Sequence, residues 1–92
     1  MTLNKKIARS ESALSTSLDG EEIVLNLTNN EYISLNTVAS EIWRILEHPS
    51  SLEEIVDELV KLYEVESGRC ERDVLELVER MSDLNLVKEK NS

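Results

Sequence analysis

Nucleophilic catalysis in this sequence would require Cys70 or a serine beside His48, the only histidine of the chain. Such a pair also needs a third group that orients the base. His48 directly precedes Pro49 at the end of a predicted helix and has no orienting partner, so we interpret it as a solvated loop residue. Cys70 falls on the apolar stripe of another predicted helix, which is typical of a small, inert core cysteine. These residues do not indicate an active site.

Adjacent acidic residues occur at Glu21-Glu22, Glu53-Glu54 and Asp57-Glu58. General acid–base catalysis needs two carboxyl groups in a cleft that gives them different pKa values. These pairs are instead predicted at a turn, in the first turn of a helix and on an outer helix face. The two glycines, Gly20 and Gly68, cannot form a glycine-rich phosphate loop, and one cysteine with one histidine cannot make a zinc site. We therefore expect no enzyme activity, no cofactor and no metal.

The net charge of −9 is unevenly distributed. Residues 1–20 have three basic and two acidic side chains (+1), whereas residues 21–92 have seven basic and seventeen acidic ones (−10). An acidic body repels nucleic acid and anionic membranes, so we expect neither as a partner. The sequence contains no apolar run of the roughly 18 residues that a membrane span needs and no signal peptide. Together with the single cysteine, this favours a cytoplasmic location.

The first half of the chain predicts a three-stranded antiparallel meander. Strands are expected over 13–18, 22–27 and 32–35, joined by turns at Asp19-Gly20 and 28–30. Period-2 alternation predicts half-buried strands, in which Leu14, Thr16 and Leu18 alternate with serines. In the second strand Ile23, Leu25 and Leu27 form the apolar face, with Val24 and Asn26 on the other. In the third strand Ile33 and Leu35 face inward. Residues 1–12 lack periodicity and are expected to form a flexible arm.

The second half predicts three helices, which makes the fold class α+β. Asn36 or Thr37 caps the first helix, which ends by His48-Pro49. A capping box from Ser51 to Glu54 begins the second helix, and the third runs from about Cys70 to Leu84. One domain is expected over residues 13–87, with a tail over 88–92.

A helix-turn-helix regulator of transcription is one alternative for a domain with three helices. Its third helix would read the DNA, yet residues 70–84 carry two arginines against five acidic residues, a balance of −3. A helix in the major groove lies next to phosphates, so this charge disfavours DNA binding. An interaction or dimerisation module that binds a folded protein is a second alternative.

A free strand at the edge of the meander is the most informative binding feature. Strand 31–35 ends the predicted sheet, and an uncovered edge is a template for another strand, including one from a second copy in a homodimer. Leu75 lies outside the core stripe of the third helix, beside Glu71, Glu79 and Ser82. This arrangement favours a peptide groove, although a scattered surface leucine is a common alternative.

Several segments resemble PqqD-like proteins in order along the chain. Residues 35–43, LNTVASEIW, resemble the LN-x-x-A-x-x-IW segment of that family. Further matches cover Glu54-Ile55-Val56, Leu59, Tyr63, Val65, Arg72-Asp73-Val74 and Leu84-Asn85-Leu86-Val87. Departures include Asn85 where glycine is common, His48-Pro49 in place of Asp-Gly, and Leu77-Val78 where an aromatic residue often occurs.

This resemblance implies a RiPP recognition element, a winged helix-turn-helix-like domain that binds the leader of a ribosomally made precursor peptide. The leader would add as a strand to the third strand, pack against the third helix, and be presented to a leader peptidase or other modifying enzyme. A short free-standing chain is most similar to the discrete leader-binding proteins of lasso-peptide pathways. The implied peptide-binding residues are Glu31, Tyr32, Ile33, Ser34, Leu35, Leu75, Val78, Glu79 and Ser82. Trp43 and Tyr63 are expected to be core anchors.

Overall fold

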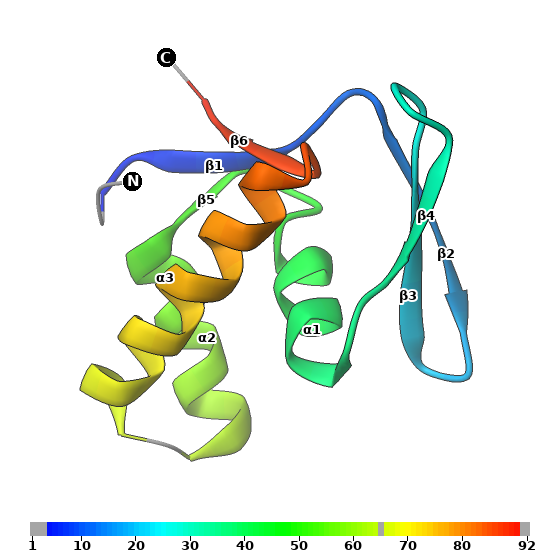
Figure 1. The fold of residues 1–92 in the computed structure, drawn as a ribbon. Helices are drawn as coiled ribbons and strands as arrows, with labels where there is room; N and C mark the ends of the chain where they lie inside the picture. Colours follow the sequence, from blue (N-terminus) through cyan, green and yellow to red (C-terminus); the bar gives the residue numbers. More distant parts are fainter. Residues whose placement is uncertain (1–3, 65, 91–92) are drawn as a thin grey trace.

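The computed structural model describes residues 4–64 and 66–90, so the first three residues of the predicted arm, Val65 and the last two residues of the predicted tail lie outside the described residues. The described chain forms two three-stranded antiparallel sheets, ordered β2-β3-β4 and β5-β1-β6, and three helices (Figure 1). The elements in chain order are β1 (Lys6–Arg9), β2 (Ala13–Leu18), β3 (Glu21–Asn26), β4 (Glu31–Ser34), α1 (Thr37–Ile45), β5 (Ser50–Ser51), α2 (Leu52–Tyr63), α3 (Ser67–Asp83) and β6 (Val87–Glu89). The predicted α+β class, with a meander followed by three helices, is confirmed.

Turn and cap residues account for the boundaries that the sequence predicts well. Asp19 and Gly20 both have positive φ, 52° and 84°, as a tight hairpin turn requires. Asn36 caps α1 by accepting the Ala39 N–H at 2.8 Å. Ser51 and Glu54 form the reciprocal capping box of α2. α3 begins at Ser67, three residues before the predicted start, so Gly68 lies in its first turn.

The N-terminal arm is not loose where it is described. β1 pairs with both β5 and β6, and Ile7 is completely buried. The predicted flexible segment 1–12 is therefore wrong for residues 6–9, and the tail predicted from residue 88 is part of β6 as far as Glu89. A strand of four residues whose partners lie about 45 and 80 positions away leaves no periodic signal in the sequence.

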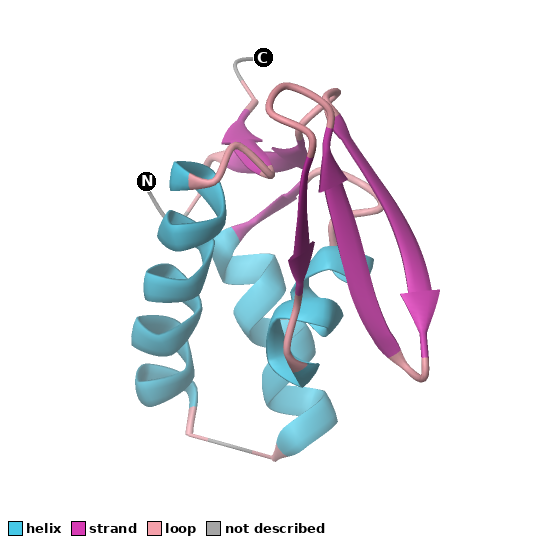
Figure 2. Ribbon diagram, turned by 45° about the vertical axis from the view of Figure 1, so that its right-hand side comes forward, coloured by secondary structure: helices cyan, strands magenta, loops and turns pink. Residues whose placement is uncertain are grey.

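The inward face of β3 is the opposite of the one predicted. Glu22, Val24 and Asn26 are buried, whereas Ile23 and Leu25 are half-buried and Leu27 is exposed. The helices lie on one side of this sheet only, and α1 is the helix nearest to it (Figure 2). Polar side chains are tolerated on the inner face because each has a partner: no buried side-chain nitrogen or oxygen of the described residues lacks a hydrogen bond.

The single tryptophan is the anchor of the core, as predicted. Trp43 is 1% exposed and packs with Ile42, Leu46 and Val24 in the hydrophobic cluster. Cys70 is also buried, as predicted. Tyr63, which was expected to be a second core anchor, is 42% exposed, because it lies in the last turn of α2, where the helix leaves the core.

Candidate functional site

β4 is the outer strand of its sheet and presents an open edge. Ile33 pairs with Val24, and the Leu35 N–H donates to the Glu22 carbonyl at 2.9 Å. Backbone groups of an antiparallel strand point alternately to its two sides. Glu31, Ile33 and Leu35 therefore pair with β3, while the N–H and C=O groups of Tyr32 and Ser34 point away from the sheet. This edge can accept a further strand through those four groups.

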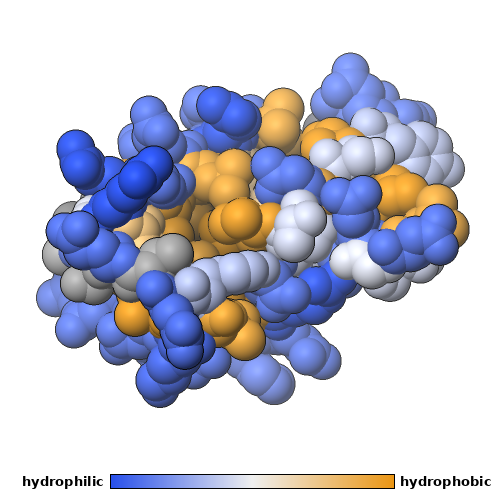
Figure 3. Space-filling view, turned by 90° about the horizontal axis from the view of Figure 1, so that it is seen from below, coloured by the Kyte–Doolittle hydropathy of each residue, from blue (hydrophilic) through white to orange (hydrophobic). Residues whose placement is uncertain are grey.

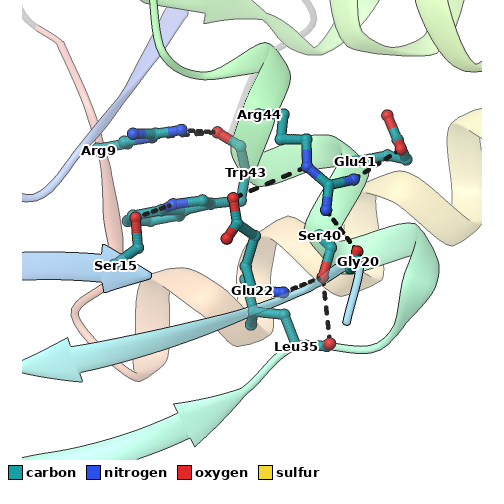
Figure 4. A network of polar contacts seen from close by, with 9 residues as sticks. All are labelled: Arg9, Ser15, Gly20, Glu22, Leu35, Ser40, Glu41, Trp43 and Arg44. Atoms are coloured by element: carbon teal, nitrogen blue, oxygen red, sulfur yellow. Dashed lines mark hydrogen bonds and ion pairs between the residues drawn. The ribbon is translucent and has the colours of Figure 1, made fainter. Parts of the chain in front are cut away.

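Polar contacts fix β3 and β4 onto α1 (Figure 4). The fully buried Ser40 hydroxyl accepts the Glu22 N–H at 2.9 Å and donates to the Leu35 carbonyl at 3.1 Å. The Arg44 guanidinium lies 3.7 Å from the Glu22 carboxylate and also binds the Gly20 carbonyl in the hairpin turn. Two side chains of α1 thus bind the beginning of β3 and the residue that follows β4, so the open edge is fixed to the helix at this end.

Trp43 connects the sheet to the N-terminal segment. Its indole N–H donates to the Ser15 hydroxyl on β2 at 2.9 Å, and the Arg9 guanidinium lies over its ring, 4.4 Å from the ring centroid. Arg9 also donates to the Trp43 carbonyl through Nε at 3.0 Å. The indole is therefore bound through its N–H and covered by Arg9 on one face. Because Trp43 is only 1% exposed, it has no free surface for a ligand.

A pocket of about 480 Å³ lies between α1, α2 and α3. It is lined by Val38, Leu59, Tyr63, Glu66, Arg69, Cys70, Asp73 and Val74. Val38 follows Leu35 by three residues, so the pocket is close to the C-terminal end of β4. Seen from below, hydrophobic surface gathers in the middle of the molecule and is enclosed by hydrophilic side chains (Figure 3). Burial, and secondly the Asp73 carboxylate, raises the pKa of the Cys70 thiol, which therefore stays protonated at neutral pH.

The flank of α3 nearest to β4 can be identified from two contacts. Asp73 shares the pocket with Val38 of α1, and the carbonyl of Leu84 accepts the Asn26 side-chain amide at 3.0 Å. Asn26 pairs with Glu31 at the start of β4. Positions 73, 77, 80 and 84 repeat at helical spacing, which puts Leu77 and Arg80 on the same flank. We call Asp73, Leu77, Arg80 and Leu84 the groove flank.

The sequence-predicted α3 residues lie elsewhere on the helix. Residues of a helix are about 100° apart, so Asp73 and Leu75 lie on opposite sides of the buried Val74. Glu79 and Ser82 follow Leu75 at spacings of four and seven and share its flank. Val78 is completely buried in the core. The structure therefore does not bring Leu75, Glu79 and Ser82 together with β4, and their part in binding stays a prediction.

The residues predicted on the strand do lie together at the open edge. Glu31, Tyr32 and Ser34 are exposed, Ile33 is half-buried and Leu35 is buried. Sequence reasoning missed the groove flank because Leu77 and Leu84 continue the helical spacing of Cys70, Val74 and Met81, which predicts core positions. Leu77 is in fact half-buried and Leu84 is 39% exposed. Helical periodicity finds the centre of such a stripe, but it does not indicate which of its two borders faces a groove.

The groove flank carries charges of both signs, although the helix as a whole is acidic. Arg80 and Asp73 lie on this flank, and Arg69 lies at the pocket. Neither arginine forms an ion pair with another described residue. Glu71 and Glu79, two of the acidic residues of α3, lie away from the groove flank. A ligand in the groove would therefore meet two available guanidinium groups.

Metal and membrane sites were also considered. The described residues contain no cluster of three or more histidine, cysteine, aspartate or glutamate side chains that could hold a metal ion. None of their helices is long and apolar enough to cross a membrane.

Comparison with known proteins identifies relatives of this domain. Residues 21–87 match the family described as coenzyme PQQ synthesis protein D (PqqD). Among solved structures, TbiB1 in complex with the TbiA(β) leader peptide is similar with a TM-score of 0.84 and 29% identity, over 92% of this chain and 99% of that chain. A lasso peptide synthetase B1 complexed with the leader peptide is similar with a TM-score of 0.76 and 25% identity, over 89% of this chain and 96% of that chain. No curated protein matched the chain.

Proposed function

Because the chain belongs to the PqqD family, we propose that it binds the leader of a ribosomally synthesised precursor peptide as an added strand along β4. In this proposal the domain presents the bound precursor to a leader peptidase or other maturation enzyme of lasso peptide biosynthesis. The observation that carries the proposal is the open edge of β4 beside an apolar pocket. The similarity to two proteins solved with leader peptides supports it.

Backbone hydrogen bonds supply the part of the recognition that does not depend on leader sequence. The N–H and C=O groups of Tyr32 and Ser34 pair with the leader strand, whose side chains then alternate between the two faces of the extended sheet. One set points toward the groove flank and the pocket near Val38, where an apolar leader side chain would be buried. Arg80 offers a partner for an acidic leader residue.

The proposed role is binding without catalysis. Cys70 is buried and its thiol pKa is raised, so it is not a nucleophile at neutral pH. His48 is exposed in the loop between α1 and β5. A reaction on the precursor therefore belongs to a partner enzyme in this proposal.

An open edge also allows pairing between two copies of the chain. β4 of one copy can pair with β4 of another through the same Tyr32 and Ser34 groups. Such a homodimer would compete with the leader, so leader addition should convert dimer to a monomer–leader complex in light scattering.

Fluorescence anisotropy with a tagged leader from the precursor gene beside this chain's gene tests the proposal. We expect saturable binding to the wild-type chain. The Tyr32→Pro variant removes one outward N–H without removing a β3–β4 hydrogen bond, because the Tyr32 N–H points away from β3. An edge strand tolerates proline at such a position. We expect it to bind at least several-fold more weakly than Tyr32→Ala, which controls for the lost ring. Absence of saturable binding to the wild type at high micromolar protein would refute the proposal.

A further inference from the structure

A side chain of α1 is inserted between β3 and β4 at one end of the open edge. The β3–β4 register places Glu22 opposite Leu35, and the Leu35 N–H donates to the Glu22 carbonyl at 2.9 Å. Two residues opposed in this way in an antiparallel sheet normally exchange a second hydrogen bond as well. Here the Glu22 N–H donates instead to the Ser40 hydroxyl at 2.9 Å, and that hydroxyl donates to the Leu35 carbonyl at 3.1 Å (Figure 4). The Ser40 hydroxyl therefore takes the place of the last hydrogen bond of the β3–β4 ladder.

Packing of α1 does not by itself require a hydroxyl at this position. Ser40 is completely buried, and the neighbouring Ala39 is buried without any polar side-chain group. Serine is less favourable than alanine inside a helix, and a buried hydroxyl costs free energy unless it is hydrogen-bonded. Both partners of this hydroxyl lie outside α1, on β3 and directly after β4. The hydroxyl thus joins the helix to both strands.

This bridge fixes the direction of an acceptor at the open edge. The Ser34 carbonyl and the Leu35 N–H belong to one planar trans peptide unit, so they point in opposite directions. Because the Leu35 N–H binds β3, the Ser34 carbonyl points outward, at the end of β4 nearest to the pocket beside Val38. The Ser40 hydroxyl holds the Leu35 carbonyl, which belongs to the next peptide unit. Both peptide units of Leu35 are therefore fixed, and the first of them carries the outward carbonyl.

We propose that Ser40 is a positioning residue for leader binding, whose hydroxyl holds the Ser34 carbonyl in the direction that an added strand needs. This inference rests on the proposed function. Without the hydroxyl, the Glu22 N–H and the Leu35 carbonyl lose their partner, and the two strands have to separate or close on each other. Either movement turns the peptide unit that carries the Ser34 carbonyl. The leader then loses one backbone hydrogen bond, whereas the groups of Tyr32 keep theirs.

The Ser40→Ala variant removes only the hydroxyl, and fluorescence anisotropy with the tagged leader measures the effect. We expect leader binding to weaken about fivefold, as the loss of one backbone hydrogen bond would cause. Ser51→Ala is the matched control, because Ser51 is also a buried serine whose hydroxyl accepts a backbone N–H, that of Glu54 at 3.1 Å. Ser51 belongs to the other sheet, so this variant should lower the thermal midpoint but keep the leader affinity within about twofold of the wild type.

A set of modified leaders separates positioning from a general loss of stability. Each leader amide is methylated in turn, which removes one N–H that could bind β4. In the wild type, two amides that are two residues apart should be sensitive, because they meet the Tyr32 and Ser34 carbonyls. In Ser40→Ala the loss of affinity on methylating one of them should largely disappear, and that on methylating the other should stay. A chain that is only destabilised would remain sensitive to both.

The wild-type chain provides a test that does not require Ser40→Ala to fold. If the bridge favours leader binding, the leader stabilises the bridge by the same factor. The Glu22 amide, which donates to Ser40, should therefore exchange more slowly at saturating leader. The adjacent Ile23 amide faces β2 and should change little.

The outcomes separate this inference from the proposed function. If the leader does not bind the wild-type chain, the proposed function fails and this inference fails with it. If the leader binds but Ser40→Ala loses no more affinity than Ser51→Ala, or remains sensitive to methylation at both amides, only the positioning role is wrong. Unchanged exchange of the Glu22 amide in the leader-bound wild type would overturn that role as well.

Discussion

The Asn26 side-chain amide donates to the Leu84 carbonyl at 3.0 Å and so connects β3 to the C-terminal end of α3, 58 residues later. The same side chain accepts the Thr28 N–H at 2.9 Å. Asn26 itself is 1% exposed, whereas its partners Thr28 and Leu84 are exposed, so the two contacts lie at the border of the core. This residue sets the distance between the strand that carries the open edge and the helix that carries the groove flank.

Replacing Asn26 by alanine should therefore destabilise the domain by about 1–3 kcal/mol, since it leaves the Leu84 carbonyl without its partner. We also expect weaker leader binding, because the two sides of the groove are no longer held together. Chemical denaturation and anisotropy measure the two effects. Asn29→Ala is the matched control: Asn29 likewise accepts the N–H two residues ahead, at 3.1 Å, but it is exposed and forms no hydrogen bond with the described residues of α3. Equal effects of the two variants would contradict this role of Asn26.

The two flanks of α3 differ in the predicted effect of a substitution. Leu84→Ser removes apolar surface from the groove flank and should weaken leader binding several-fold, with a small change in the thermal midpoint. Leu75 packs against the core from the other flank, so Leu75→Ser should lower the thermal midpoint and leave the leader affinity nearly unchanged. Anisotropy and thermal melts on both variants measure this. The reverse pattern would restore the assignment of Leu75, Glu79 and Ser82 that the sequence suggests.

The contact between Lys6 and Glu54 makes the stability of the fold depend on pH. The Lys6 ammonium, and then the Ser51 N–H, lower the pKa of the Glu54 carboxyl from 4.5 to about 2. A carboxyl whose pKa is lower in the folded chain stabilises the fold above pH 4.5, and this stabilisation is lost as the pH falls toward 2. The thermal midpoint of Glu54→Gln should be below that of the wild type at pH 7, and the two should converge as the pH falls from 4.5 toward 2. Glu53→Gln in the same helical turn serves as control, and a constant difference at all pH values would contradict the assignment.

Local signals in the sequence were sufficient to predict the order of the three meander strands and the three helices. A hairpin turn, a helix cap and a capping box depend only on residues that are close together in the chain. Each is found where it was predicted, at Asp19-Gly20, Asn36 and Ser51–Glu54. The open edge at residues 31–35 was also predicted, since it follows from the order of strands in a meander. The structure shows which backbone groups of this edge are free: within β4, the N–H and C=O groups of Tyr32 and Ser34 point away from β3.

Features that depend on distant partners could not be predicted. The inward face of β3 was assigned by apolar alternation, but Asn26 and Glu22 turn inward because Leu84 and Arg44 satisfy them. β1 is stabilised by strands near residues 50 and 88. The groove flank is defined by the position of α3 relative to Val38, which no pattern within α3 contains.

Amide hydrogen exchange with and without leader tests strand addition to β4 most directly. The N–H groups of Ile33 and Leu35 already bind β3, so their exchange should be slow in the free chain and change little. Those of Tyr32 and Ser34 face the open edge, so they should exchange fast in the free chain and become protected at saturating leader. Protection confined to Tyr32 and Ser34 within β4 is the result that strand addition predicts. Unchanged exchange of these two amides, with leader bound, would contradict it.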